Sequence, residues 1–317
     1  MVTTKVIVSD NHIWNFGEVV TAIASAKYQN QDLELDLNAE GPAFEELGLF
    51  EYIGKWDSRT TVITRNPVQQ PVGRITFIKC YPHFITSTKD ALCNVPVNKE
   101  IKKPVGIFIG RSNVHRLYLS SYIYSSGCAH QTFRYDHTQE FHQNNLGFDG
   151  LVQQYGLGPI DNIVKLLHKS PLTVNDDPDI QGNNALTYVL HREYTHFLVE
   201  IVCETYYSGR TFFPTEKTWR PIMLETPFIV QGPQWYLHRL KDLGFRTFDS
   251  WWDEGYSEDP ADHQPREIVK VINYLTEKSK KELDIMYEEM LPTLKHNKKR
   301  FMELTSKDFE IFKNDNR

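Results

Sequence analysis

The residues with the clearest chemical potential form one run, Thr215-Glu216-Lys217. The run follows an apolar stretch and a polar loop, and the residues after it have helical patterning, which predicts that it opens a helix. The first turn of a helix carries free backbone N–H groups and a partial positive charge, and both favour phosphate. Lys217 adds a full charge, and the Glu216 carboxylate can accept hydrogen bonds from sugar hydroxyls. We therefore expect a ligand with phosphate and sugar here.

Arginines that suit the same ligand follow another predicted strand. An apolar run from Val105 ends at Gly110, Arg111 comes next, and Arg116 lies further along the helix expected there. A planar guanidinium matches two phosphate oxygens at once. Arg111 and Lys217 together would place two positive charges beside a phosphate group. A structural salt bridge is the alternative interpretation of Arg111.

The first run also carries a family resemblance. The sequence TEKTWRP of Thr215–Pro221 resembles the Thr-Glu-Lys-Leu-(Phe/Trp)-Arg motif of the family-10 fucosyltransferases. In that family the motif opens a helix of the donor domain and binds the nucleotide sugar. The preceding strand, with Glu200 and Glu204, is similar to the strand before the family's motif, and Thr226–Val230 is similar to the apolar strand after it.

The segment from residue 197 to 254 is still more similar to glycosyltransferase-like proteins encoded by large phages and viruses. Those proteins share a Gly-Phe-(Lys/Arg)-Thr-Phe stretch like Gly244–Phe248, followed by an acidic stretch like Trp251–Glu254. Two positions depart from the fucosyltransferase pattern. The family's Asn-Ser after its strand glutamate is absent, with Cys203-Glu204-Thr205 nearby instead, and Thr218 replaces the motif leucine. The sugar and the nucleotide base therefore stay open.

The resemblance implies an α/β glycosyltransferase of the GT-B class, with two Rossmann-like domains facing a cleft and C-terminal helices. It implies that a hexose or pentose moves from a nucleotide sugar to a hydroxyl acceptor, with inversion and without a metal. The predicted donor-binding residues are Arg111, Arg116, Glu200, Glu204, Thr215, Glu216, Lys217 and Arg220. Taken alone, Glu216 and Lys217 could also be a solvated pair on a helix, and Arg220 could position other residues.

Inversion needs a base that takes the proton of the acceptor hydroxyl. Asp10 is the first candidate, with Glu18 and His12 behind it, because this region follows the first predicted strand on the rim of the expected cleft. A turn-capping aspartate and a surface histidine are the alternative interpretation. The carboxylates that also stay open are Glu40, Glu45 and Glu46.

No metal site is predicted. Asp177-Pro178-Asp179 matches the DxD pattern of the other large glycosyltransferase class, which binds a metal–nucleotide complex. It lies in a stretch rich in proline and aspartate with no apolar strand before it, which is typical of a solvent loop. The four cysteines form no CxxC pair, and no histidine cluster has zinc-ligand spacing. We expect no cofactor beyond the donor itself.

Strands alternate with helical segments along the chain, which predicts parallel sheets covered by helices. Strands are expected at Val6–Val8, Leu33–Leu37, Thr60–Thr64, Arg74–Lys79, Val105–Arg111, Phe197–Thr205 and Phe228–Val230. Helices are expected at Trp14–Lys27, Ala43–Ile53, Ile160–Leu167, Thr215–Leu224, Gln234–Leu243, Pro265–Lys278 and Lys280–Lys307, with one more capped by Ser112-Asn113. Gly244 is expected to end its helix and Pro292 to interrupt the last one.

A polar, lysine-rich stretch that ends at Pro104 predicts a domain boundary. Residues 1–104 are expected to form an acceptor-side Rossmann-like domain, and residues 105–290 the Rossmann-like domain that binds the donor. Residues 291–317 are expected to form a C-terminal helix that crosses back to the first domain.

Charge and composition bound the partners. The net charge is -6, so the chain has no general attraction to nucleic acid or to an anionic membrane. No apolar run could span a bilayer and no signal peptide is recognised, so we expect a soluble protein in the cytoplasm, or in the host cytoplasm if it is viral.

The acceptor stays open between a glycan or small molecule and hydroxymethylated bases of phage DNA. Residues 55–103 carry 9 Lys or Arg against 3 Asp or Glu, a basic region that could bind DNA. The alternative function is a nucleotide-sugar-binding module that no longer catalyses transfer.

Overall fold

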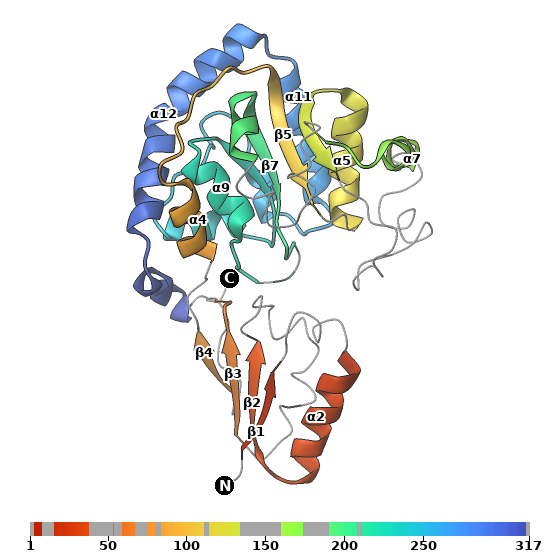
Figure 1. Ribbon diagram of the computed structural model, residues 1–317, viewed down its shortest axis with the longest axis vertical. Coiled ribbons are helices and arrows are strands. Elements are labelled where there is room, and N and C mark those ends of the chain that lie inside the picture. Colours follow the sequence, from red (N-terminus) through yellow and green to blue (C-terminus); the bar gives the residue numbers. More distant parts are fainter. Residues whose placement is uncertain are drawn as a thin grey trace. The chain divides into compact units, whose positions relative to one another are not determined.

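The computed structural model describes residues 3–7, 16–37, 53, 59–66, 75–79, 84–110, 114–133, 160–173, 190–207, 209 and 211–314. The chain divides into two compact units (Figure 1). Unit 1 comprises Met1–His83, Ser208–Phe213 and Leu304–Arg317, and unit 2 comprises Phe84–Tyr207 and Pro214–Glu303. Each unit has its own parallel sheet, so the prediction of an α/β chain with two Rossmann-like sheets is confirmed.

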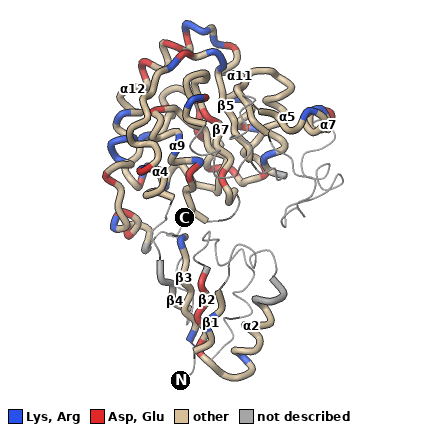
Figure 2. The backbone as a smooth tube through the Cα atoms, viewed as in Figure 1, with Lys and Arg blue, Asp and Glu red and all other residues tan. Residues whose placement is uncertain are grey.

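Unit 1 is built on a parallel sheet with the strand order β1-β2-β3-β4. Its main elements are β1 (Thr3–Ile7), α2 (Phe16–Tyr28), β2 (Asp32–Leu37), β3 (Thr60–Thr64) and β4 (Ile75–Lys79). Alternation along the strands sends Leu33, Leu35 and Val62 into the core. Charged residues of β1 and β2 lie at the alternate positions (Figure 2), with Lys5 Nζ 2.9 Å from the Glu34 carboxylate.

Unit 2 contains the second parallel sheet, in the order β6-β5-β7-β8. Its strands are β5 (Lys103–Ile109), β6 (Ala129–Phe133), β7 (Phe197–Cys203) and β8 (Phe228–Gln231). Its helices are α4 (Phe84–Leu92), α5 (Val114–Ser126), α7 (Ile160–Lys169), η3 (Leu190–Thr195), α9 (Glu216–Met223), α10 (Tyr236–Asp242), η4 (Gly255–Glu258), α11 (Gln264–Thr276) and α12 (Lys280–Glu303). Helices α5 and α11 cover one face of the sheet, and α9 and α12 cover the other (Figure 1). All residues of β7 and β8 are buried, as expected for parallel strands covered on both faces.

The strand order gives this sheet a switch point between β5 and β7. From β5 the chain moves outward to β6 and then returns to β7 on the other side of β5. In open α/β sheets ligands bind at the carboxyl ends of the strands beside such a point. Gly106 allows these two strands to pack closely, because a Cβ there would lie 2.7 Å from the Phe197 ring.

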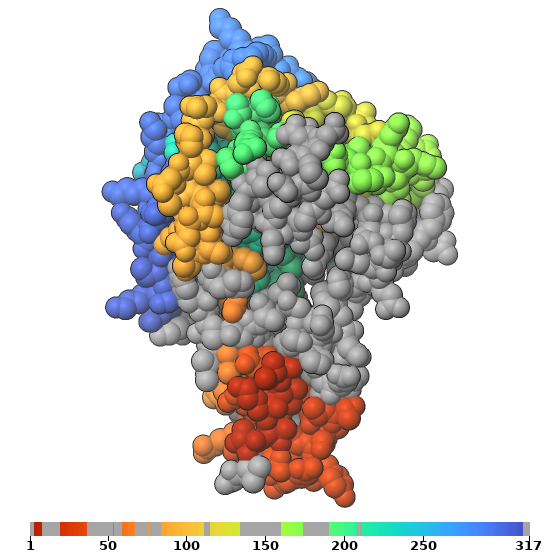
Figure 3. Space-filling model, in the orientation of Figure 1, coloured from red at the N-terminus to blue at the C-terminus, as the bar shows by residue number. Residues whose placement is uncertain are grey.

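Residues 84–103 belong to unit 2, so the units divide before α4 rather than near residue 104. Figure 3 shows this segment lying beside α12. Lys89 Nζ donates to the Met302 carbonyl at 3.0 Å, and Lys99 Nζ lies 5.6 Å from the centre of the Tyr287 ring. Lys99 belongs to the lysine-rich stretch that predicted a linker, and its contact instead joins this segment to α12.

The C-terminal part of the chain differs from the prediction at Pro292 and at the boundary of unit 2, which falls after Glu303 rather than after residue 290. Helix α12 continues through Pro292, so the predicted interruption there is wrong. Met290 and Leu294 are buried on either side of it, and this packing holds the helix although proline removes one backbone donor. Residues after Glu303 are grouped with unit 1 and include η5 (Ser306–Asn314). Gly244 follows α10 with φ +87°, the predicted left-handed end.

Candidate functional site

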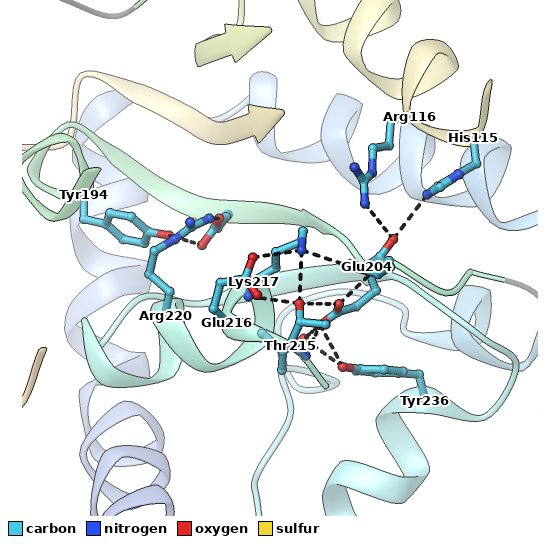
Figure 4. A network of polar contacts seen from close by, with 12 residues as sticks. His115, Arg116, Tyr194, Glu204, Thr215, Glu216, Lys217, Arg220 and Tyr236 are labelled. Carbon is cyan, nitrogen blue, oxygen red and sulfur yellow. Dashed lines mark hydrogen bonds and ion pairs between the residues drawn. The ribbon is translucent and has the colours of Figure 1, made fainter. Parts of the chain in front are cut away.

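The carboxyl ends of β5 and β7 bring the first turns of α5 and α9 to one residue, Glu204 (Figure 4). Glu204 follows β7 directly and is 1% exposed. Its backbone carbonyl bonds to α5, and its carboxylate bonds to the start of α9. Because this edge is the switch point of the sheet, the first turn of α9 lies where open α/β sheets bind ligands.

The Glu204 carboxylate accepts five hydrogen bonds. Thr215 donates two of them, from its N–H at 3.1 Å and its hydroxyl at 2.7 Å. The Thr218 hydroxyl donates at 2.6 Å, the Tyr236 hydroxyl at 3.1 Å and the Thr205 N–H at 3.2 Å. The buried charge is therefore well compensated, and it holds α9 and α10 against the end of β7.

The Glu204 carbonyl oxygen joins the same residue to α5. It accepts hydrogen bonds from His115 Nε2 and Arg116 Nη2, each at 3.2 Å. A carbonyl only accepts, so the Nε2 atom of His115 carries the proton. Burial, reinforced by the charges of Arg116 and Lys217, lowers the pKa of His115 well below its usual value, and the ring is neutral. Arg116, a predicted donor-binding residue, lies at the carboxyl edge of this sheet, and its guanidinium donates to the backbone carbonyl of Glu204.

The first turn of α9 carries the predicted charged pair. Thr215 is the N-cap, and its hydroxyl accepts the Lys217 N–H at 3.3 Å. Lys217 Nζ lies 2.9 Å from the Glu216 carboxylate and 3.3 Å from the hydroxyls of Thr205 and Thr215. The two charged side chains are 24% and 22% exposed, so a ligand can reach them. Burial raises the pKa of Glu216, but the adjacent Lys217 ammonium outweighs this and lowers it.

Glu200 and Arg220 form a buried ion pair with each other. Arg220 Nη2 donates to the Glu200 carboxylate, and the Tyr194 hydroxyl bonds to both. The three residues are 1%, 4% and 2% exposed. Burial raises the pKa of Glu200, while the Arg220 guanidinium works in the opposite direction. These contacts do not support the predicted role of the pair as donor ligands; they fasten α9 to the middle of β7.

An aromatic contact at this edge went unpredicted. The ring of Tyr207 stacks on the ring of His115, with centroids 3.9 Å apart and planes 12° apart. Neither residue belongs to the motif run. The available signal is the aromatic pair Tyr206-Tyr207 in the polar loop after β7, a place where ligand-binding residues of such sheets occur.

Other predicted residues fall outside the described part of the chain. These are Asp10, His12, Arg111, Glu40, Glu45, Glu46 and the DxD match Asp177-Pro178-Asp179, while Glu18 is described only by its backbone in α2. Within the described ranges, no group of three or more His, Cys, Asp or Glu could hold a metal ion. Burial raises the pKa of the free thiol of Cys203, next to Glu204, to about 12, which disfavours its thiolate form.

No protein-family model matches the chain, and no curated protein matches its sequence. Among the helices of the described ranges, none has the length and apolar composition needed to cross a membrane. Function must therefore be inferred from the residues at this sheet edge, because a fold of this kind serves many activities.

Proposed function

We propose that the chain is a glycosyltransferase of the GT-B class whose nucleotide-sugar donor binds unit 2 at the carboxyl ends of β5 and β7. One observation supports this most. The first turns of α5 and α9 meet at Glu204, and the partly exposed ammonium group of Lys217 lies beside them. Two helix N-termini and a reachable lysine favour the binding of a diphosphate.

The donor contacts follow from the pair at the start of α9. The Lys217 ammonium group exchanges Glu216 for a phosphate oxygen when the donor binds, since lysine is a mobile point charge. The released Glu216 carboxylate accepts hydrogen bonds from hydroxyls of the ribose or of the sugar. Arg111, which follows Gly110 at the end of β5, is the proposed second cation on the diphosphate.

The proposed transfer is a direct displacement. The acceptor oxygen bonds to the anomeric carbon, the bond from that carbon to the phosphate oxygen breaks, and the diphosphate leaves with the electron pair. A carboxylate takes the hydroxyl proton, with Asp10 as the first candidate and Glu18 and His12 behind it. Lys217 and Arg111 stabilise the charge on the leaving diphosphate. The acceptor hydroxyl belongs to a glycan or small molecule, or to a hydroxymethylated DNA base.

A binding module without catalysis is the second candidate. Glu204 and Glu216, the carboxylates described at the start of α9, are both hydrogen-bonded within the protein. Neither carboxylate is therefore a catalytic base without a partner in the protein. A module would bind the nucleotide sugar through Lys217 and release no nucleoside diphosphate when an acceptor is added.

The test of the proposed donor site is ligand-dependent stability. Thermal unfolding is measured with UDP, GDP, CMP and dTDP sugars, with and without a divalent ion. A ligand at 100 times its dissociation constant adds about 2.7 kcal/mol to the free energy of unfolding. We expect one nucleotide to stabilise the wild type without a metal, and Lys217→Ala to lose this effect. Lys280→Ala, which removes an exposed lysine of α12, is the matched control and keeps it.

Two results would count against the proposal. Stabilisation by no nucleotide at millimolar concentration would return Glu216 and Lys217 to the interpretation as a solvated pair. Equal stabilisation of wild type and Lys217→Ala would move the donor site away from α9. Release of nucleoside diphosphate with an acceptor present separates the transferase from the binding module.

A further inference from the structure

Tyr207 presents an aromatic ring at the proposed donor site. It lies three residues after Glu204, in the loop that leaves the carboxyl end of β7. The His115 ring covers one of its faces at a centroid distance of 3.9 Å. Tyr207 is nevertheless partly exposed, whereas His115 is 1% exposed. The exposed part of Tyr207 is therefore not the ring face that His115 covers.

His115, which supports Tyr207, is itself held by a contact with Glu204. The His115 ring is fixed by the hydrogen bond from Nε2 to the Glu204 carbonyl at 3.2 Å, and it lies in the first turn of α5. Its Nδ1 atom is buried and has no hydrogen-bond partner among the described residues. An imidazole held in this way keeps the stacked tyrosine ring in one orientation, so little conformational freedom is lost when a ligand packs on it.

Glu204 positions both the His115 ring that supports Tyr207 and the end of the site proposed to bind phosphate. The Glu204 carbonyl positions His115, and the Glu204 carboxylate positions the N-cap of α9 at Thr215. A nucleotide has two parts that need different partners, an anionic diphosphate and a flat aromatic base. The helix start with Lys217 suits the first part, and a rigid, partly exposed aromatic ring suits the second, because every nucleobase has a stacking face.

We propose that Tyr207, backed by His115, is the stacking platform for the nucleobase of the donor. This inference rests on the proposed function and names the residue that binds the base. Stacking contributes affinity for an aromatic base without selecting among bases by hydrogen bonds. Tyr207 is thus a ligand-binding residue, and His115 is a positioning residue that acts through it.

The test compares a ligand that has a base with one that lacks it. Dissociation constants are measured by calorimetry for the nucleoside diphosphate that stabilises the wild type and, by its displacement, for inorganic pyrophosphate. We expect Tyr207→Ala to weaken nucleoside diphosphate binding about 5- to 100-fold and to leave pyrophosphate binding unchanged. Tyr207→Phe keeps the ring and keeps both affinities. Lys217→Ala weakens the binding of both the nucleoside diphosphate and pyrophosphate.

Tyr207→Leu guards against a folding defect, because leucine still covers His115 but has no aromatic face. We expect Tyr207→Leu to weaken nucleoside diphosphate binding as much as Tyr207→Ala does. An equal loss of both ligands in Tyr207→Leu would show that the residue is structural, and unchanged nucleotide affinity would place the base elsewhere. Either result overturns the platform while the donor site stands. A wild type that binds neither ligand overturns the proposed function itself.

Discussion

At the scale of single residues, Glu204 stands out because both its backbone and its side chain bind other elements. Its carbonyl accepts hydrogen bonds from two residues of α5, and its carboxylate accepts five from the β7 loop, α9 and α10. A buried carboxylate is tolerated only with such compensation. Its contacts give it a positioning role, and the charges that a ligand can reach belong to Glu216 and Lys217.

Glu204→Gln tests this positioning role. The amide keeps the shape of the side chain but offers one accepting oxygen instead of two, so the hydrogen bonds from Thr215 and Thr218 cannot all remain. Hydrogen bonds to charged groups contribute about 1.5–3 kcal/mol each, and we expect the variant to lose about 2–4 kcal/mol of unfolding free energy. Urea unfolding measures the loss. Glu303→Gln, an exposed change at the end of α12, should alter stability by less than about 0.5 kcal/mol, and a similar small effect at Glu204 would contradict the role.

His115 gives the site a pH dependence of predictable sign. Its folded pKa is well below the unfolded value because it is buried and faces Arg116 of its own helix and Lys217 of α9, with Tyr207 and the Glu204 carbonyl as its other partners. Below the unfolded pKa, near 6.5, the unfolded chain binds a proton that the folded chain does not. The free energy of unfolding therefore falls as the pH drops below about 6.5, by at most about 1.4 kcal/mol per pH unit from this residue.

The measurement for this prediction is the difference in unfolding free energy between wild type and His115→Gln from pH 7.5 to 5. Glutamine can keep a donor toward the Glu204 carbonyl but does not titrate. The wild type should lose stability relative to the variant below about pH 6.5. A difference that stays constant with pH would show that His115 has the same pKa in the folded and the unfolded chain.

The motif run could be predicted from sequence, but the partners of its neighbours could not. Thr215, Glu216 and Lys217 open α9 as expected because strand, polar loop and helix patterning are local signals. Glu200 and Arg220 are twenty positions apart in the chain, and sequence alone does not distinguish a charge that binds a ligand from one that binds another charge. The stack of Tyr207 on His115 joins residues from two separate elements, and the aromatic pair in the loop after β7 does not indicate its partner in α5.

At the scale of elements, the site depends on the attachment of α9 to β7. Two buried contacts make that attachment, one at the start of the helix and one in its second half. Glu204 holds the first turn through Thr215, and Glu200 holds Arg220, which lies in the second half of α9. The first turn of α9 can present Lys217 in a fixed place only if both contacts hold.

The buried Glu200–Arg220 pair predicts a non-additive result. Removal of one partner leaves an uncompensated buried charge, so Arg220→Met should cost about 3–5 kcal/mol of unfolding free energy. The double variant Arg220→Met with Glu200→Leu replaces both charges by apolar groups of similar size and should cost less than the single change. A double-mutant cycle in urea measures this, and a double loss equal to the sum of the two singles would contradict it.

Strands and helices with strong periodicity were predictable, and the exceptions have physical reasons. The strand Thr60–Thr64 is found as predicted, since all five of its residues are β-branched and their burial alternates along the strand. Strand β6 was missed because Ala129–Phe133 is polar, which an edge strand of the β6-β5-β7-β8 sheet tolerates. Pro292 failed as a helix breaker because packing of α12 against unit 2 outweighs one lost hydrogen bond.

At the scale of the whole molecule, the chain forms two units, each with its own parallel sheet. Every described residue of the proposed donor site lies in unit 2, including Glu204, Tyr207, Thr215 and Lys217. Unit 1 is completed by distant segments, since residues 208–213 and 304–317 are grouped with it. The last described segment is therefore expected to matter for unit 1 and not for donor binding.

Phe312→Ala tests this division. Phe312 is 1% exposed and its ring lies 5.4 Å from that of Phe212, both in unit 1. Loss of such a ring costs about 3–5 kcal/mol. Amide hydrogen exchange should show lower protection in β1–β4 and unchanged protection in β5–β8, with nucleotide affinity kept. Phe248→Ala in unit 2, which removes a ring packed 5.2 Å from Phe228, should give the reverse pattern and weaken the nucleotide. If Phe312→Ala lowers protection equally in both sheets, the two units unfold as one cooperative body, and donor binding would then depend on the whole chain.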